Sequence, residues 1–421
     1  MKFGTQLMRQ ADDLAAFSEM AGGITRAYLT PQHRQAGDYL IALMRSAGMQ
    51  AGYDVLGNIV GRYAGATPNA PWLITGSHQD SVRDAGRYDG LYGILSPIAC
   101  VQALHAQGRR LPYGIEVVGY GDEEGVRFGL TLIGSKALAG QFDFAWLDKA
   151  DAQGVTLREA IERFHGTPLT DAQLQARIAA LARSPAHTVA VVESHIEQGP
   201  VLLDEGLPVG VVTAIAGASR LRARVRGLAG HAGTVPMPGR RDALAAAAEM
   251  VLAVEQHCAA DARLVGTVGK LEVAEGGAIN VIPGDVSFTL DLRSGDDAAR
   301  TAAVQALRER CDAVAARRRV ALEWTPLFAS GAAPCDARLQ AALAASVAAH
   351  GVPVRHLPSG AGHDAMSFHG VLPQGMLFVR CGNGGISHNP LETMTAEDAE
   401  LSTQVLLHFF EHFDAARFLA A

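Results

Sequence analysis

The chain has 421 residues, of which 48% are hydrophobic and 19% are charged, and its formal net charge is −7. This length favours two or three domains, or one large domain with an insertion, and the apolar fraction is enough for sizeable cores. The negative charge disfavours nucleic acid and anionic membranes as partners, although a locally positive site for a small anionic substrate is still allowed.

The cysteines and the N-terminus bear on the cellular compartment. Five cysteines are scattered along the chain, and none forms a C-x-x-C pair, a usage typical of a reducing compartment rather than of a disulfide framework. The stretch MKFGTQLMRQADDLAAF lacks the continuous apolar segment of a signal peptide. No apolar run approaches the roughly 18 residues of a membrane span. We therefore expect a cytoplasmic protein that does not enter the membrane.

Short apolar runs predict buried strands in the first half of the chain and near its end. They occupy residues 72–75, 115–118, 188–192 and 376–379, and a helical pattern from Gly93 to Gln107 follows the first. Alternation of this kind indicates an α/β sheet. Each run leads into His, Asp or Glu, and in open α/β sheets ligands gather beyond the carboxyl ends of the strands.

The middle of the chain has a different pattern. Four arginines alternate with apolar residues, which predicts a strand with one basic, solvated face; they are Arg220, Arg222, Arg224 and Arg226. The elements expected after it are a helix at 242–257, strands at 264–273 and 286–293, a helix at 296–318 and a strand at 320–324. This β-α-β-β-α-β order matches the ferredoxin-like pattern. We therefore expect an α/β catalytic domain with a mixed sheet flanked by helices (residues 1–211 and 329–421), interrupted by a smaller α+β domain (residues 212–328).

Two segments offer metal ligands. His78 follows the first strand and Asp89 lies in the next loop, so together they can supply imidazole nitrogen and carboxylate oxygen, with Asp80 placed to orient the imidazole. Glu123 and Glu124 follow the second strand, and adjacent carboxylates that share a site need a cation or a trapped proton. One can bind metal while the other takes a proton from water. Taken singly, a structural histidine and a solvated acidic loop explain these segments equally well or better.

Seven motifs in order carry a family resemblance. They span residues 76 to 390 and comprise GSHQDSV with RYDG, DEEGVRF, ESHIEQGP, GHAGTVPM, INVIPGDVSFTLDLR, PSGAGHDA and GISHNP. Together they resemble the M20 metallopeptidase clan, and within it the hydantoinase/carbamoylase branch. That branch contains N-carbamoyl-L-amino-acid hydrolases, β-ureidopropionases, and allantoate and ureidoglycolate amidohydrolases.

The resemblance implies two divalent metal ions per subunit. Asp89 would bridge them, His78 and His195 would complete one site, and Glu124 with His388 would complete the other. Glu123 would be the general base. Three histidines and two carboxylates suit zinc, with manganese, cobalt or nickel as alternatives.

The resemblance also implies substrate contacts. His231 would donate a hydrogen bond to the developing oxyanion, with a homodimer partner completing the site, and Asn280 would bind the same region. Arg293 lies on the polar face of its predicted strand and can present a bidentate fork to a carboxylate. Further substrate contacts are implied for Gln198, Gly362 and His363.

The expected activity is hydrolysis of the ureido (N-carbamoyl) C–N bond of a small carboxylate substrate, most simply an N-carbamoyl-L-amino acid. Allantoate and ureidoglycolate are alternative substrates, and a peptidase or N-acyl-amino-acid deacylase is a more distant alternative. A binding protein with a dead site would require a missing ligand or base, and none is missing. Two departures from the family pattern, at Ser194 and in residues 380–383, leave the specificity open.

Overall fold

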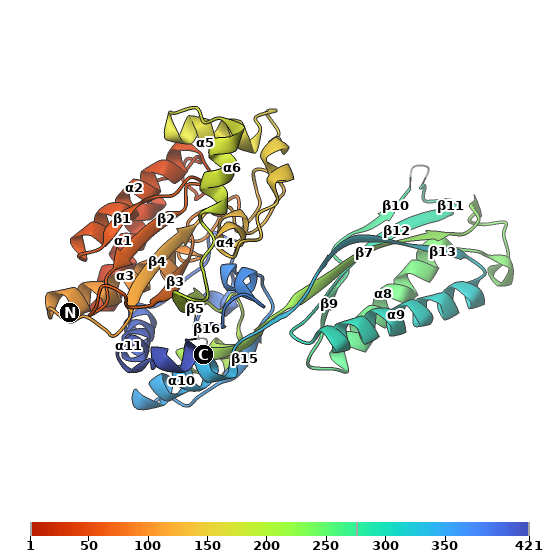
Figure 1. Ribbon diagram of the computed structural model, residues 1–421. Helices are drawn as coiled ribbons and strands as arrows, with labels where there is room; N and C mark the ends of the chain where they lie inside the picture. Colours follow the sequence, from red (N-terminus) through yellow and green to blue (C-terminus); the bar gives the residue numbers. More distant parts are fainter. Residues whose placement is uncertain (1, 275–276, 420–421) are drawn as a thin grey trace. The chain divides into compact units, whose positions relative to one another are not determined.

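The computed structural model describes residues 2–274 and 277–419 (Figure 1). The chain forms two compact units, each described by itself. Unit 1 comprises Met1–Thr213, Cys335–Leu357 and His363–Ala421, and unit 2 comprises Ala214–Pro334 and Pro358–Gly362. The boundaries predicted from the sequence lie near residues 212 and 328, and no sequence pattern indicates that residues 358–362 return to unit 2.

Unit 1 is built on a mixed sheet with the strand order β1-β2-β4-β3-β5-β16-β6. The central strands β4, β3, β5 and β16 are parallel to one another, whereas β1, β2 and β6 pair antiparallel. The strands are β1 Gln50–Tyr53, β2 Ile59–Tyr63, β3 Trp72–His78, β4 Gly114–Tyr120, β5 Thr188–Ile196, β6 Val209–Ile215 and β16 Gln374–Val379. The predicted α/β class with a mixed sheet is confirmed.

Helices cover both faces of this sheet, because successive strand residues point to opposite sides. Ile115 and Val117 of β4 pack into a core with α1, α2, α3, α10 and α11. Val118 and Tyr120 pack into another core with α4 and the 3₁₀ turn Asp364–Phe368. The helices of unit 1 are α1 Phe3–Ala15, α2 Pro31–Ser46, α3 Leu91–Ala106, α4 Ile133–Leu138, α5 Leu157–His165, α6 Asp171–Ala179, α7 Val201–Asp204, α10 Ala337–Ala349 and α11 Ala396–His412.

Unit 2 is an antiparallel sheet with the order β10-β12-β7-β13, and β9 also pairs with β12. Helices α8 and α9 pack on one face, against Leu221, Ala223 and Val225 of β7. The elements are β7 Gly217–Arg226, β8 Gly230–His231, α8 Ala243–Ala259, β9 Val265–Thr267, β10 Leu271–Val273, β11 Val281–Ile282, β12 Asp285–Ser294, α9 Asp297–Arg318 and β13 Ala321–Ser330; the short strands β14 Ala333–Pro334 and β15 His356–Ser359 pair with β6.

The four arginines of β7 lie on the opposite, solvent-exposed face of the unit 2 sheet. Ion pairs neutralise much of their charge: Arg220 contacts Asp291 at 3.0 Å, Arg224 contacts Asp285 at 2.5 Å, and Arg226 contacts Glu323 at 2.8 Å. The expectation of a solvated strand face is therefore confirmed. Within the described residues, no helix has the length and apolar character needed to cross a membrane.

Candidate metal centre and active site

The proposed ligands of unit 1 gather at one edge of the parallel strands. His78 is the last residue of β3, His195 lies at the end of β5, and Glu123 and Glu124 follow β4. His388 lies in the loop after β16. Since these strands are parallel neighbours, their carboxyl ends meet at the same edge of the sheet. Segments that are distant in sequence are thereby brought together.

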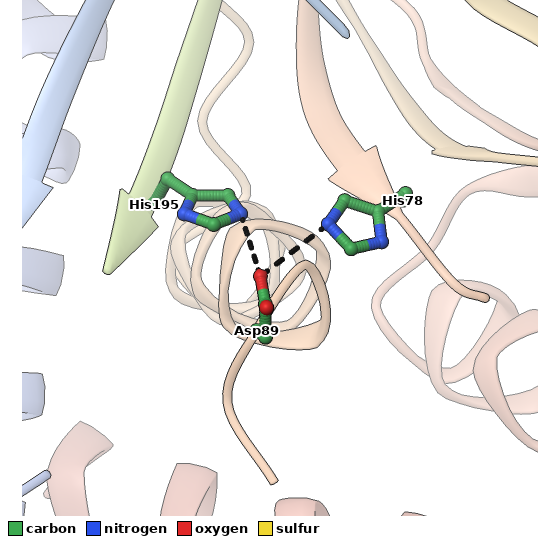
Figure 2. A group of neighbouring side chains, drawn as sticks. All are labelled: His78, Asp89 and His195. Atoms are coloured by element: carbon green, nitrogen blue, oxygen red, sulfur yellow. Dashed lines mark ion pairs between the residues drawn. The ribbon is translucent and has the colours of Figure 1, made fainter. Parts of the chain in front are cut away.

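Asp89 lies at the centre of this group, just before α3. Its Oδ1 atom is 3.5 Å from His78 Nε2 and 3.3 Å from His195 Nε2, and Figure 2 shows both imidazoles directed at this carboxylate. Its Oδ2 atom is 3.2 Å from His388 Nε2, which is 3.5 Å from Glu124 Oε1. The two oxygens of one buried carboxylate thus belong to two separate ligand groups.

Gly90 permits this close approach. It has a φ of +67°, and a Cβ atom added to it would lie 2.5 Å from the His78 ring. Only glycine meets both requirements, because other residues rarely adopt this conformation and their Cβ would collide with the imidazole. The Asp89-Gly90 pair therefore turns the chain into α3 while holding the carboxylate against His78.

The imidazole tautomers suit metal binding. His78 Nδ1 is 3.0 Å from the carbonyl oxygen of Asp80, and His195 Nδ1 is 2.9 Å from that of Ile196. A carbonyl only accepts, so each Nδ1 carries a proton, and Nε2, the atom turned toward Asp89, is the one left to bind a cation. Neighbouring donor atoms of a tetrahedral site with ligands at 2.0–2.1 Å are about 3.4 Å apart, close to the separations around Asp89. The donor set therefore fits divalent metal.

Asp80 has a different role from the one expected. Its carboxylate is 3.9 Å from His78 Nδ1, and its oxygens instead accept the backbone N–H groups of Glu123 and Glu124 at 3.1 and 3.2 Å. The main-chain carbonyl of Asp80 orients the His78 imidazole, while the Asp80 side chain holds the backbone of Glu123 and Glu124. A single sequence does not distinguish these two uses.

Burial shapes the charges of the acidic residues. Burial raises the pKa of Glu124 to about 7 and that of Glu123 well above its usual range. Burial alone would also raise the pKa of Asp89, but contacts with His195, His388 and His78 hold it well below its usual range. Carboxyl groups this close and this buried ionise readily only beside cations, which again fits a metal centre.

Glu123 lies beside this centre. Ligand atoms of His78, Glu123 and Glu124 lie within 4.8 Å of one another, and so do those of Asp89, Glu124 and His388. Glu124 is common to both groups, whereas Glu123 belongs only to the first. Glu124 therefore lies within reach of both His78 and His388, with a 3.5 Å contact to His388, whereas Glu123 lies beside His78 and Glu124 only.

Gln198 and His363 also contact the ligand groups in unit 1. Gln198 Nε2 is 3.1 Å from Asp89 Oδ2 and 3.3 Å from His388 Nε2. His363 is buried, and its ring packs edge-on against His195 with centroids 4.5 Å apart. Burial and the neighbouring His195 hold the pKa of His363 well below its usual range.

The remaining expected substrate residues belong to unit 2. His231 on β8 pairs with Val281 on β11, and Asn280 accepts the N–H of Ala232 through its carbonyl at 2.9 Å. The Gly233 N–H donates to His231 Nδ1 at 3.0 Å, so the proton is on Nε2, which is thereby a donor. Gly362 lies at the end of the segment that returns to this unit.

Arg293 lies on the polar face of β12, as predicted, because burial alternates along that strand. Its guanidinium makes two hydrogen bonds to the Asp291 carboxylate, at 3.0 and 3.1 Å, and a third to the carbonyl of Gly360 at 2.9 Å. These three contacts fix the plane of the guanidinium within unit 2.

Two buried carboxylates at the centre were not singled out from the sequence. Glu193 accepts hydrogen bonds from Ser77 Oγ at 2.7 Å and from the Ala365 N–H at 2.8 Å. Glu392 contacts the loops that carry Asp89 and His388. Glu193 stands beside His195 in a motif already noted, whereas Glu392 follows Pro-Leu in a loop and carries no signal of its own.

Comparisons with known proteins show which chains this one is similar to. A model of peptidase family M20/M25/M40 matches residues 74–412. An N-carbamoyl-L-amino acid amidohydrolase from Geobacillus stearothermophilus is 39% identical, with 92% of this chain and 93% of that protein covered. Allantoate deiminase 1 from Glycine max is 37% identical, with 95% and 87% covered. The crystal structure of a hydantoinase/carbamoylase family amidase from Burkholderia multivorans has a TM-score of 0.89 at 33% identity, with 99% and 98% covered.

Proposed function

Because this chain belongs to peptidase family M20/M25/M40, among relatives that are amidohydrolases of N-carbamoyl and ureido C–N bonds, we propose that it hydrolyses an N-carbamoyl-L-amino acid with the help of two divalent metal ions. Allantoate is the principal alternative substrate, since the allantoate deiminase is nearly as similar as the N-carbamoyl-L-amino acid amidohydrolase; ureidoglycolate is a further one. The observation that carries the proposal is the Asp89 carboxylate, whose two oxygens face different ligand groups.

In this proposal Asp89 would be shared by two divalent cations, most simply zinc. His78 and His195 would hold the first with their Nε2 atoms, and Glu124 and His388 would hold the second. Ions bound there supply Lewis-acid activation of water and of the substrate carbonyl. The Nδ1 contacts of His78 and His195 support these roles, because they leave the Nε2 atoms, which are turned toward Asp89, to bind a cation.

Glu123 is the general base. Its carboxylate lies beside His78 without joining the group of Asp89, Glu124 and His388, and its raised pKa brings it closer to the range in which a carboxyl group both takes and returns a proton. It removes a proton from the attacking water, whose oxygen bonds to the ureido carbon. It then protonates the leaving nitrogen as the C–N bond breaks. For an N-carbamoyl-amino acid the resulting carbamate decomposes to carbon dioxide and an amine or ammonia, according to which C–N bond breaks.

Residues of unit 2 bind the substrate in this proposal. His231 donates from Nε2 to the oxyanion, where one such donor is worth about 3 kcal/mol, and Asn280 binds the same region. Arg293 receives the substrate carboxylate, which suits its planar fork. Gln198, Gly362 and His363 complete the contacts. We further propose a homodimer that acts in the cytoplasm, the latter supported by five cysteines that are buried and unpaired.

A hydrolysis panel tests the function. Purified protein supplied with Zn²⁺, Mn²⁺, Co²⁺ or Ni²⁺ would be incubated with N-carbamoyl-L-amino acids, allantoate, ureidoglycolate, N-acetyl-amino acids and dipeptides. We expect release of an amino acid from one or more N-carbamoyl substrates. Turnover of allantoate alone would select the alternative, and turnover of dipeptides or N-acetyl-amino acids alone would contradict ureido hydrolysis.

A further inference from the structure

Glu392 links the two loops that carry Asp89 and His388. It is 2% exposed and lies four residues after His388, in the loop between β16 and α11. Its Oε1 atom accepts the backbone N–H groups of Tyr88 at 2.8 Å and Asp89 at 3.3 Å. Its Oε2 atom accepts the hydroxyl of Ser387 at 2.7 Å. One carboxylate thus ties together segments that are about 300 residues apart in the sequence.

The surroundings of Glu392 are shaped to receive it. A Cβ atom at Gly86 would lie 2.2 Å from the Glu392 carboxyl group, so the loop before Asp89 needs glycine at this position. His388 has a left-handed backbone with a φ of +54°, a conformation that is uncommon for residues other than glycine. The bond from the adjacent Ser387 to Glu392 helps to hold the chain in that conformation.

Ser387 makes the link chemically specific. Its Oγ lies 2.7 Å from Glu392 Oε2 and 3.2 Å from Asp89 Oδ2, but a hydroxyl has only one hydrogen to donate. The shorter contact assigns that hydrogen to Glu392. Asp89 Oδ2, on the His388 side, already accepts a hydrogen bond from Gln198 Nε2 at 3.1 Å, so the Ser387 hydrogen would be a second donor on this oxygen and would compete with a cation for its remaining lone pair. If Glu392 could not accept, the hydroxyl hydrogen would turn to Asp89 Oδ2.

We propose that Glu392 is a positioning residue for the second metal, the one assigned to Asp89 Oδ2, Glu124 and His388. It fixes the Asp89 backbone and draws the Ser387 hydrogen away from the bridging carboxylate. This inference rests on the proposed metal ligands. Substitution of residues that hydrogen-bond to metal ligands typically changes metal affinity by about 10–100-fold.

Three variants separate this role from a general structural one. Glu392→Gln keeps the size of the side chain and an oxygen for the Tyr88 and Asp89 N–H groups, but it presents an NH₂ group to Ser387. Asp336→Ala is the matched control: Asp336 also accepts two backbone N–H groups, those of Arg338 and Leu339, but it caps α10 and lies in none of the ligand loops. His388→Ala supplies the reference for loss of the second site.

The measurement is a competitive titration of metal-free protein with Zn²⁺ and a chromophoric chelator, with the melting temperature of each variant recorded alongside. We expect the wild type to bind two Zn²⁺ and His388→Ala to bind one tightly. Glu392→Gln should bind the second Zn²⁺ about tenfold or more weakly and the first as the wild type does. Its kcat should recover at high Zn²⁺, and Asp336→Ala should bind both ions normally.

The outcomes distinguish the two levels of the proposal. Wild-type affinity for both ions in Glu392→Gln would overturn the role of Glu392 alone. Equal weakening of both ions, with a fall in melting temperature like that of Asp336→Ala, would show a merely structural residue and would overturn it as well. A wild type that binds fewer than two Zn²⁺, or a His388→Ala protein that still binds two, would overturn the proposed metal ligands and the inference with them.

Discussion

At the scale of single residues, the centre combines three histidines with buried carboxylates whose negative charges repel one another, since Asp89 acts on Glu124 and Glu124 acts on Glu123. The separations from Asp89 to His78, His195 and His388 are 3.2–3.5 Å, and burial raises the pKa values of Glu123 and Glu124. Burying ionisable groups costs free energy unless they are paired or hydrogen-bonded. Packing alone therefore does not account for such a cluster. Substitution of the proposed base should therefore leave the metal content unchanged, whereas substitution of a proposed ligand should lower it.

Glu123→Gln should keep both metals and lose turnover. The amide has nearly the same size but cannot take a proton from water, and general-base catalysis contributes about 10²–10⁴-fold to the rate. Glu124→Gln should lose metal together with activity. Elemental analysis beside kcat checks both. Metal loss in Glu123→Gln comparable with that in Glu124→Gln would mean that the two roles are exchanged.

Patterns in the sequence predict that the proposed ligands lie at one edge of the sheet, but they do not predict the side chains that support these ligands. His78, Glu123, Glu124 and His195 follow apolar strands, so a pattern in the chain itself brings them to one edge. The Asp80 carboxylate accepts hydrogen bonds from the backbone N–H groups of Glu123 and Glu124. This contact depends on how two loops approach each other in the fold. The contact of Glu392 with Tyr88 spans most of the chain, and no local pattern encodes it.

At the scale of elements, the turn into α3 has a strict requirement at Gly90. Gly90→Ala would place a methyl group 2.5 Å from the His78 ring at a φ of +67°. We expect the ring to be displaced and the first metal to bind roughly tenfold or more weakly, as with other changes to the partners of a metal ligand. Zinc titration measures this. The matched change Gly108→Ala has a similar φ of +64° with open space around it, so it controls for backbone strain; equal affinities in both variants would refute the steric requirement.

Helix α2 carries a histidine that should make stability depend on pH. His33 is fully buried, and burial, with the charges of Arg26 and Arg127, lowers its pKa to about 3. The unfolded chain, with a pKa near 6.5, takes up a proton that the native state does not. Stability is therefore complete above pH 6.5 and falls as the pH drops toward 3, by about 2 kcal/mol at pH 5.

His33→Phe tests this contribution, since Tyr28 and Phe164 already pack against the ring. Urea unfolding of the wild type and the variant at pH 7.5 and pH 5 gives the free energies. The loss of stability between the two pH values should be about 2 kcal/mol smaller in the variant. Identical losses would mean that His33 is protonated as easily in the folded protein as in the unfolded chain.

One predicted element was wrong in detail for a physical reason. The expected single strand 264–273 is divided into β9 and β10. Thr267 faces Asp291 and Leu271 faces Phe288, so four steps along this strand (267 to 271) match three along β12 (288 to 291). The extra residue is a β-bulge, which interrupts the ladder. Hydrophobic alternation does not reveal such an insertion when both flanks keep an apolar pattern.

At the scale of the whole molecule, the proposed catalytic groups are divided between the two units. The metal ligands and Glu123 belong to unit 1, whereas His231, Asn280 and Arg293 belong to unit 2. We propose that unit 2 of one chain completes the site of a second copy in a two-fold dimer. The alternative is completion within one chain, and the two arrangements make opposite predictions for mixed oligomers.

Subunit mixing decides between them. Glu123→Gln and His231→Ala proteins, each inactive, would be combined under conditions that allow subunit exchange. If sites are shared, half of the dimers at equal mixing are heterodimers and one of their two sites regains both groups, so activity should approach about a quarter of the wild type. No recovery, with heterodimers verified by native mass spectrometry, would show that each chain completes its own site.

The central claim is that turnover of a ureido substrate depends on two metal ions held around Asp89. The most direct test is to remove metal with a chelator, verify its absence by elemental analysis, and follow hydrolysis of an N-carbamoyl-L-amino acid or allantoate as Zn²⁺ or Mn²⁺ is returned. Activity should vanish on chelation and return in proportion to metal up to two ions per chain, and Asp89→Asn should bind neither ion tightly. Full activity in protein shown to be free of metal would contradict the claim.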